Sequence, residues 1–365
     1  RTPLRLGIVS AHVRRHSVWD AILKGLMAHV DPAFVEVEVF HLGALRDGET
    51  QWAAAHAAHF DQGPHEPHVW AQRILARQPD VLLYPEIGME LTIMHLAAQR
   101  LAPVQAVTWG HPHTTGLPTI DCFFSAASLE PPDAADHYTE RLICLPRLGC
   151  CITASRVDPE PIRLERLGIK TDAPLLLSPG TPYKYAPQHD WVFPAIAKRL
   201  GRCTIAFFKD PGAPWAYLND RLIGRLSKAF AERGMRFADH CVVLPWQERA
   251  AYYALMQRAD LMLDTIGFSG FNTAMQAMEC GLPVVTRKGR FMRGRLAGGI
   301  LQEMGLAELI AEDEAGYVNL AVEVASDSGR RTALRGRIEE RRGALFNDTG
   351  TVRAFQDALL DIARR

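Results

Sequence analysis

Short apolar segments alternate with longer amphipathic ones along almost the whole chain, and this alternation leaves few folds open. Short, mainly apolar runs predict buried strands, and the segments between them carry apolar residues at helical spacing. Strands that alternate with helices indicate βαβ units and a parallel sheet covered on both faces. In the first half we predict strands at Leu4–Val9, Val35–His41, Val81–Tyr84, Ala106–Thr108, Cys122–Ser125 and Arg141–Leu145, and helices at Val18–Val30, His68–Arg77 and Leu91–Gln99.

The same alternation starts again after residues 153–161, so the chain is predicted to hold two doubly wound α/β domains. A length of 365 residues also suits two domains. We place them at 1–155 and 156–350, with a C-terminal helix at 351–365 that packs back on the first domain. In such pairs the ligand is expected between the domains, at the carboxyl ends of the strands. The predicted strands are Leu175–Ser178, Cys203–Phe208, Cys241–Leu244, Leu261–Asp264 and Pro283–Thr286, and the helices are His189–Leu200, Ala216–Arg233, Gln247–Arg258, Asn272–Cys280, Tyr317–Ala325, Arg331–Asn347 and Thr351–Ala363.

Charge and composition exclude several classes of protein. Lys and Arg number 41, as do Asp and Glu, and this zero net charge argues against a general nucleic-acid binder. No apolar run approaches the roughly 18 residues that span a bilayer, and the first residues show no signal-peptide core. The seven cysteines include no C-x-x-C pair, which favours reduced, mostly buried thiols in a cytoplasmic protein.

Four histidines lie close together in a stretch rich in Gly and Pro, at positions 56, 59, 65 and 68. A solvated helix end and loop is the simpler interpretation, and a metal site is the alternative.

Two common nucleotide motifs are missing: no G-x-G-x-x-G follows the first predicted strand, and no G-x-x-x-x-G-K-[ST] occurs anywhere. The sequence therefore predicts neither a dinucleotide-binding domain of the usual kind nor a P-loop nucleotidase.

The segment Leu261–Thr286 is the most informative part of the chain. It reads as a strand, a glycine loop, a helix, a glycine stop and a second strand. Free amides at the start of the helix, together with its dipole, make a site for an anion such as a diphosphate. A plain capped helix is the alternative. The residues expected to contribute are Gly267 and Gly270 for close backbone approach, Ser269, Asn272 and Thr273 at the helix start, and Gln276 one turn later toward a sugar hydroxyl.

Cations follow two other predicted strands of the second domain. Lys184 lies in the loop after Leu175–Ser178, where it could neutralise a leaving phosphate or be a simple surface lysine. Residues 287–295 hold five cations, and this stretch is either a solvated loop or a further source of attraction for phosphate.

Three loops of the first domain each follow a strand and each carry a residue suited to proton transfer or hydrogen bonding. They contribute His16, Glu86 and His111. A histidine can act as a general base near neutral pH, and a carboxylate can do the same. For each residue alone, a packing, capping or solvated role is the alternative, and only their convergence at one edge indicates a catalytic site.

These motifs, taken in order, resemble glycosyltransferase family 41, the family of O-linked N-acetylglucosaminyltransferases, and are similar to its bacterial adhesin N-glucosyltransferases. The resemblance extends from Gly7 to about Leu359. The motifs that carry it are Val9-Ser10 with His16, Tyr84–Met89, Leu101–Gln105 leading into Gly110–Gly116, Tyr183-Lys184, Gly270–Thr273 and Gly281–Thr286.

The resemblance implies a GT-B fold and an inverting, metal-independent transfer of GlcNAc or glucose from a UDP-sugar to a protein Ser, Thr or Asn side chain. No Asp-x-Asp follows a strand to hold a divalent ion, and no cofactor besides the donor UDP-GlcNAc or UDP-glucose is implied. Tetratricopeptide repeats often precede this domain in the family, and this sequence contains none. An epimerase or phosphorylase of the same fold and a non-catalytic nucleotide-sugar-binding module are the competing interpretations.

Residue roles also follow from the resemblance. On the donor side, Lys184 matches the diphosphate-binding lysine, and Phe271, Asn272 and Thr273 match the phosphate-contacting helix start, beside Ser269 and Gly270. Gln276 stands at the ribose position, where the family usually has an acidic residue, and Thr181 replaces a Gln. Arg249 and Tyr252 lie in the helix that contacts the uracil base. On the acceptor side, His16 matches a proposed base or orienting group, and His111 matches a histidine of the bacterial branch.

Overall fold

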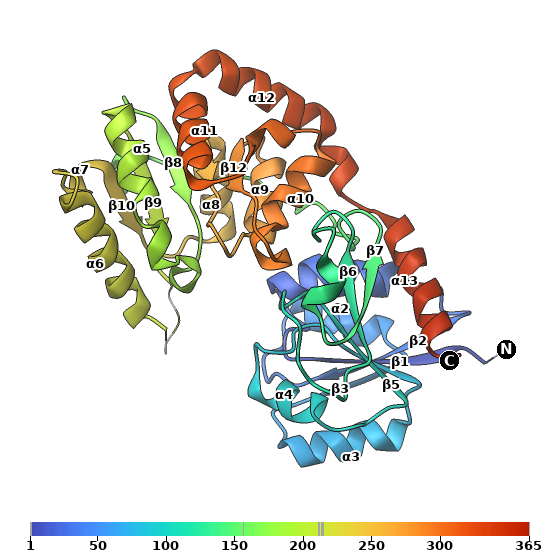
Figure 1. Ribbon diagram of the computed structural model, residues 1–365. Coiled ribbons are helices and arrows are strands. Elements are labelled where there is room, and N and C mark those ends of the chain that lie inside the picture. Colours follow the sequence, from blue (N-terminus) through green and yellow to red (C-terminus); the bar gives the residue numbers. More distant parts are fainter. Residues whose placement is uncertain (1, 156, 211, 213–214, 365) are drawn as a thin grey trace. The chain divides into compact units, whose positions relative to one another are not determined.

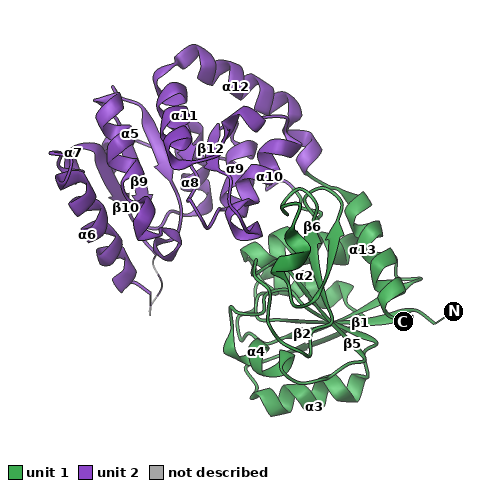
Figure 2. Ribbon diagram, in the orientation of Figure 1, with its two compact units in different colours: residues 1–153, 346–365 green, residues 154–345 purple. Residues whose placement is uncertain are grey.

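The computed structural model describes residues 2–155, 157–210, 212 and 215–364 (Figure 1). It divides into two compact units, the first made of residues 1–153 and 346–365 and the second of residues 154–345 (Figure 2). The last segment of the chain therefore belongs to the same unit as the first. Each unit has its own sheet and its own core, and each is described by itself.

A seven-stranded parallel sheet forms the centre of unit 1, in the order β3-β2-β1-β4-β5-β6-β7. Its inner strands are buried on both faces, as expected for apolar runs without alternation. The strands are β1 Leu4–Ser10, β2 Val35–His41, β3 His59–Gln62, β4 Val81–Tyr84, β5 Val104–Thr108, β6 Cys122–Ala126 and β7 Arg141–Leu145.

Helices cover this sheet. The segment predicted as one helix at Val18–Val30 is a π-helical turn followed by an α-helix. The helical elements of unit 1 are η1 Trp19–Leu23, α1 Lys24–His29, α2 Gly48–His56, α3 Pro67–Arg77, α4 Leu91–Ala97, η2 Ala134–His137 and α13 Thr349–Ile362.

Unit 2 is built around a six-stranded parallel sheet in the order β10-β9-β8-β11-β12-β13. The strands are β8 Leu175–Ser178, β9 Thr204–Phe208, β10 Cys241–Leu244, β11 Leu261–Leu263, β12 Val284–Arg287 and β13 Ile310–Ala311. The helices are α5 Val192–Leu200, α6 Tyr217–Ala231, α7 Phe237–His240, α8 Arg249–Arg258, α9 Phe271–Glu279, α10 Leu296–Glu303, α11 Glu314–Ser326 and α12 Ser328–Arg341, with short turns at η3 Leu164–Leu167, η4 Pro182–Lys184, η5 Pro187–His189, η6 Met292–Gly294, η7 Ala307–Leu309 and η8 Arg342–Leu345.

The predicted strands are all present, but the sequence analysis missed two edge strands, β3 and β13. β3 has one apolar residue, Phe60, among three polar ones, so no apolar run marks it in the sequence, and all four residues are half-exposed. β13 has only two residues. The helices α2 and α10 were also missed, and the helix predicted at Arg331–Asn347 ends at Arg341.

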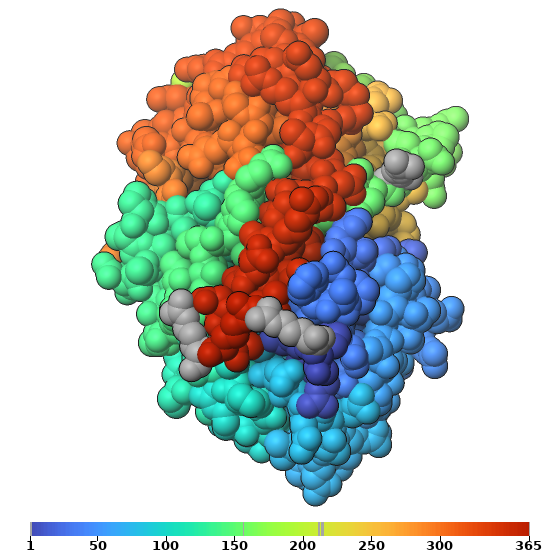
Figure 3. All heavy atoms as spheres, turned by 90° about the vertical axis from the view of Figure 1, so that its right-hand side faces the viewer, coloured from blue at the N-terminus to red at the C-terminus, as the bar shows by residue number. Residues whose placement is uncertain are grey.

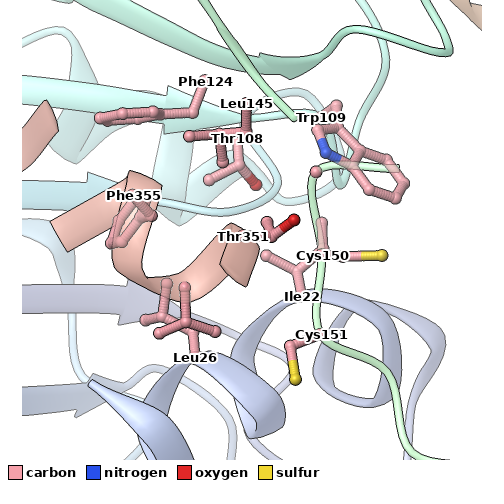
Figure 4. A pocket seen from close by; sticks show the side chains of 12 residues that line it. Ile22, Leu26, Thr108, Trp109, Phe124, Leu145, Cys150, Cys151, Thr351 and Phe355 are labelled. Carbon is pink, nitrogen blue, oxygen red and sulfur yellow. The ribbon is translucent and has the colours of Figure 1, made fainter. Parts of the chain in front are cut away.

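The C-terminal helix α13 packs on unit 1, between α1 and β7 (Figures 1 and 3). Phe355 stacks at an angle against Phe124 of β6, with ring centroids 4.7 Å apart. The Thr351 hydroxyl donates to the carbonyl of Pro146, and the Gln356 side chain accepts from the amide of Asp31. A small apolar cavity remains beside this helix, bounded in part by Phe355, Phe124 and Cys150 (Figure 4). None of the described helices is long and apolar enough to cross a membrane.

Candidate functional site

Each sheet reverses its strand order at one point, between β1 and β4 in unit 1 and between β8 and β11 in unit 2. The loops that leave two such neighbouring strands diverge to opposite faces, and ligands of doubly wound folds bind where they part. His16 and Glu86 follow β1 and β4, and Lys184 and the Gly267–Thr273 segment follow β8 and β11. These candidates thus lie at the two reversal points, one in each unit, whereas His111 follows β5 and Arg249 and Tyr252 lie in the helix after β10.

In unit 2, the carboxylate of Asp264 organises the loop after β11. It is 3% exposed and accepts hydrogen bonds from the Ser269 hydroxyl (2.6 Å), the Gly270 amide (2.9 Å) and the Thr286 hydroxyl (2.7 Å). Burial raises the pKa of this carboxyl, while these three donors oppose the rise. Asp264 therefore anchors the glycine loop to β12 and sets where helix α9 begins.

Helix α9 starts at Phe271 with Gly270 as its N-cap, and no described side chain caps it. Ser269, expected to help at the helix start, is fully buried, and its hydroxyl donates to Asp264 and accepts from the Ala297 amide (2.8 Å). Its side chain is thus used inside the protein. Asn272 and Thr273 are half-exposed in the first turn. A helix start without a side-chain cap presents amide donors and the positive end of the dipole, which suits an anion.

Lys184 ends the short turn η4 that follows β8 and is half-buried. Its ammonium lies 4.6 Å from the centroid of the Phe268 ring, in the loop that leads to α9. Burial lowers the pKa of Lys184, and the carboxylate of Asp264 partly offsets that effect. The cation and the uncapped helix thus come from neighbouring strands of one sheet.

The remaining donor-side candidates come from η4, α8 and α9 of unit 2. Thr181 is the N-cap of η4, and its hydroxyl is buried with no partner among the described residues. Arg249 is the first residue of α8 and is half-exposed. The Tyr252 ring meets Phe208 edge-on at 5.6 Å, and its buried hydroxyl also lacks a described partner. Gln276 is half-buried in the second turn of α9.

The basic stretch at 287–295 is occupied largely within the protein. Arg287 pairs with Glu314 and Lys288 with Glu312, and the Arg295 guanidinium donates to the Gly289 carbonyl. The Arg290 and Arg293 side chains lie over the Phe291 ring. These contacts favour a structural loop over a further phosphate site.

In unit 1, Glu86 is fully buried directly after β4. One of its carboxylate oxygens accepts from the Ser10 hydroxyl (2.7 Å) and from the Ala11 amide (2.8 Å), and its other oxygen has no partner among the described residues. Burial raises the pKa of Glu86 to about 8. Glu86 therefore ties the ends of β1 and β4 together and titrates near neutral pH.

His16 lies in the turn after β1, stacked flat on His12 with ring centroids 3.8 Å apart. Its Nδ1 accepts a hydrogen bond from the Val18 amide at 3.2 Å. Burial, with a smaller contribution from Arg14, lowers the pKa of His16 to about 4. His16 is therefore neutral at pH 7.

His111 begins the loop after β5 and rests against Gly88, where an added Cβ would lie 2.9 Å from its Nδ1. Gly88 has a φ of +106°, a backbone conformation that residues with a side chain disfavour. The loop after β4 can therefore lie against the ring of His111 at this glycine. Glu140 holds the rest of the His111 loop by accepting from the Thr115 amide (2.7 Å) and the Thr114 hydroxyl (2.7 Å).

The described residues contain no group of three metal-ligating side chains, and His59 lies in strand β3 rather than in a loop.

Sequence reasoning missed Asp264, His12 and Glu140 as organising residues. Asp264 and His12 stand directly after strands, a signal that the same reasoning used for Glu86. Nothing local marks Glu140, because its partners lie 25 and 26 positions away.

Comparison with known proteins identifies relatives of the chain. Residues 227–353 match the model of glycosyl transferase family 41. A probable UDP-N-acetylglucosamine–peptide N-acetylglucosaminyltransferase SPINDLY of Solanum lycopersicum is 30% identical over 254 residues, which are 67% of this chain and 25% of that protein. The UDP-glucose:protein N-beta-glucosyltransferase of Actinobacillus pleuropneumoniae is 25% identical over 288 residues, 77% of this chain and 44% of that protein. The chain spans about a quarter of the length of its plant relatives.

Among solved structures, an O-GlcNAc transferase variant of Thermobaculum terrenum superposes with a TM-score of 0.86 at 24% identity, covering 99% of this chain and 68% of that one. This similarity, with that to other sugar transferases, confirms the predicted α/β architecture: the two doubly wound units are those of a GT-B fold.

Proposed function

Because the chain carries a glycosyltransferase family 41 domain, we propose that it transfers a hexose, GlcNAc or glucose, from a UDP-sugar to a side chain of a protein. The relatives in both branches are named for such transfers, one to peptides from UDP-N-acetylglucosamine and one to protein nitrogen from UDP-glucose. The proposal covers the activity, the donor and the acceptor of this chain.

The observation that carries the proposal is that Lys184 and the uncapped start of α9 follow the two strands at the reversal point of the second sheet, with the Lys184 ammonium 4.6 Å from the Phe268 ring in the loop that leads to α9. A departing UDP gains negative charge on its diphosphate as the glycosidic bond breaks. Preorganised donors and one cation at that place stabilise the transition state more than the ground state. Amides of Asn272 and Thr273 and the ammonium of Lys184 would fill this role without a metal ion.

On the acceptor side, we assign His16 and His111 of unit 1 to binding and orienting the attacking side chain, and the buried Glu86 to holding the turn after β1 that carries His16. The acceptor oxygen or nitrogen attacks the anomeric carbon from the face opposite UDP, which inverts its configuration. Thr181, Arg249, Tyr252 and Gln276 would contact the nucleoside, with Gln276 offering an uncharged amide to a ribose hydroxyl.

A nucleotide panel tests the donor assignment. UDP, GDP, CMP and their sugars are added to the purified chain, and the melting temperature is followed, because a ligand that binds the native state stabilises it by mass action. UDP and its sugars should give the largest shift. A larger shift with GDP or CMP would contradict the donor assignment.

Transfer is then measured from UDP-GlcNAc and UDP-glucose to a mixed peptide library by mass spectrometry. Addition of a hexose or N-acetylhexosamine mass to peptides supports the proposal. Conversion of the UDP-sugar to its epimer without a peptide would support an epimerase, and UDP binding with no product would support a binding module.

A further inference from the structure

The turn after β1 restricts which nitrogen of His16 can meet a substrate. The Val18 amide donates a hydrogen bond to His16 Nδ1 at 3.2 Å, just before η1 begins. An amide N–H needs a lone pair, so Nδ1 of this ring is unprotonated. A neutral imidazole carries a single proton, and that proton must then be on Nε2.

The surroundings of His16 keep the ring neutral. His12 lies over one face at 3.8 Å with only 10° between the planes, and His12 is itself buried. The titratable and charged groups that act on this pair are Arg14 and, behind His12, His41. Burial is the main cause that lowers the pKa of His16 to about 4 and that of His12 to about 3. Both rings are therefore uncharged at neutral pH.

Hydrogen bonds to Glu86, which follows β4, hold the beginning of the turn after β1. Glu86 accepts from Ser10 and Ala11, and the Ser10 hydroxyl in turn accepts from the His12 amide at 3.0 Å. The His41 ring contacts the Ser10 carbonyl at 3.2 Å. The backbone that leads from β1 into this turn is thus anchored to residues that follow β4 and to His41 at the end of β2.

A neutral ring with Nδ1 occupied and a proton on Nε2 has no free lone pair for a proton from an acceptor. We propose that His16 is a hydrogen-bond donor, which offers its Nε2–H to an oxygen of the bound substrate, and that it is not the general base. His12 is the positioning residue that covers the His16 ring. This inference rests on the proposed function for its activity readout, since it assigns a role within that same reaction.

The first experiment reads the tautomer without using activity. The chain is labelled with ¹⁵N-histidine, and the two ring nitrogens of His16 are assigned by NMR at pH 7, with the His16→Gln variant identifying the signals. A protonated Nε2 and an unprotonated Nδ1 are expected. A proton on Nδ1, or a charged ring at pH 7, would overturn the proposal even if the chain proved to be no glycosyltransferase.

The second experiment separates donor from base by substitution. Glutamine keeps an N–H donor but does not take up a proton near neutral pH, so His16→Gln should retain kcat/KM within about tenfold of the wild type. His16→Ala removes the donor and should lose about 10–100-fold, the range for a hydrogen bond of 1.5–3 kcal/mol to a charged group. If both variants lose activity equally while UDP still raises the melting temperature, His16 is not acting as a donor.

Variants of His12 test the positioning role. His12→Phe preserves a flat ring over His16 and should leave the His16 titration unchanged. His12→Ala opens that face to water, so the pKa of His16 should rise toward 6.5 and kcat should fall with little change in UDP binding. An unchanged His16 titration in His12→Ala would show that the stack has no such role.

Discussion

At the scale of single residues, one buried carboxyl group organises each of the two reversal points. Asp264 accepts three hydrogen bonds and lies near the Lys184 cation. Glu86 accepts two, has one oxygen without a described partner and titrates near neutral pH. Burial raises the pKa of both groups, and it is opposed by three hydrogen-bond donors and the Lys184 cation at Asp264 and by two donors at Glu86.

Replacing Lys184 with alanine should lower kcat by about a hundredfold or more, because one lost contact to developing charge typically costs about 2.7–4 kcal/mol of barrier. The melting temperature should change little. Burial lowers the pKa of Lys184, which means that the fold does not stabilise its charged form, so loss of that charge should cost little stability. Steady-state kinetics and thermal unfolding measure both effects. Lys198→Ala, at an exposed lysine of α5, is the matched control, and near-normal turnover in Lys184→Ala would reject the role.

The raised pKa of Glu86 predicts how stability depends on pH. The folded state holds a proton on Glu86 up to about pH 8, whereas the unfolded chain releases it near 4.5, so stability contributed by this group falls as pH rises between those values. Glu86→Gln stays neutral and escapes this loss. The difference in unfolding free energy between Glu86→Gln and wild type should therefore move in favour of the variant from pH 5 to pH 8, by roughly 4 kcal/mol at most. Urea unfolding at both pH values measures it, and a constant difference would contradict the raised pKa.

At the scale of elements, the start of α9 is made by a glycine that has no room for a side chain. A Cβ at Gly270 would lie 2.1 Å from the Thr273 hydroxyl, and the Gly270 amide is the one that Asp264 holds. The first turn of α9 follows this glycine without a side-chain cap. The backbone at the start of α9, rather than any one polar side chain, would then form the anion site.

Gly270→Ala should therefore weaken UDP binding by about tenfold, because the Thr273 side chain or the helix start must shift, and a tenfold change corresponds to about 1.4 kcal/mol. Isothermal titration with UDP measures the affinity. The control is Gly336→Ala in α12, where an added Cβ meets nothing within 4 Å and alanine should slightly stabilise the helix. Equal UDP affinity in both variants would argue against a site at the start of α9.

At the scale of the whole molecule, the chain leaves unit 1 after residue 153, builds unit 2 and returns at residue 346. Unit 1 therefore needs both ends of the sequence. α13 supplies Phe355 against Phe124, and Thr351 lies beside the same apolar cavity (Figure 4). Unit 2 is one continuous segment.

Phe355→Ala should destabilise unit 1 selectively, by about 3–5 kcal/mol, since it removes a fully buried aromatic ring next to an existing cavity. Calorimetry should show one transition moved to lower temperature, and UDP should still stabilise the other transition. Arg353→Ala, at an exposed position of the same helix, is the control. A uniform shift of all unfolding would mean that the two units do not unfold independently.

The sequence by itself was enough to predict the inner strands, most helices and the loops that carry the candidate residues. Apolar runs and glycine spacing are local features of the sequence, so they can be recognised without knowing which segments pack together. Polar edge strands such as β3 escaped, because their pairing comes from neighbours and leaves no apolar pattern. The roles assigned to His16, Lys184 and the α9 residues stay predictions until the experiments above are done.

Only the tertiary structure decided which polar atoms are already occupied. The Ser269 hydroxyl, a capping candidate by sequence, is bonded to Asp264 and to the Ala297 amide 28 positions away. The Ser10 hydroxyl donates to the carboxylate of Glu86, 76 positions away, and the Val18 amide donates to Nδ1 of His16. A side chain's residue type sets what it can donate or accept, but burial and long-range packing determine which partner it meets and how its charge is stabilised.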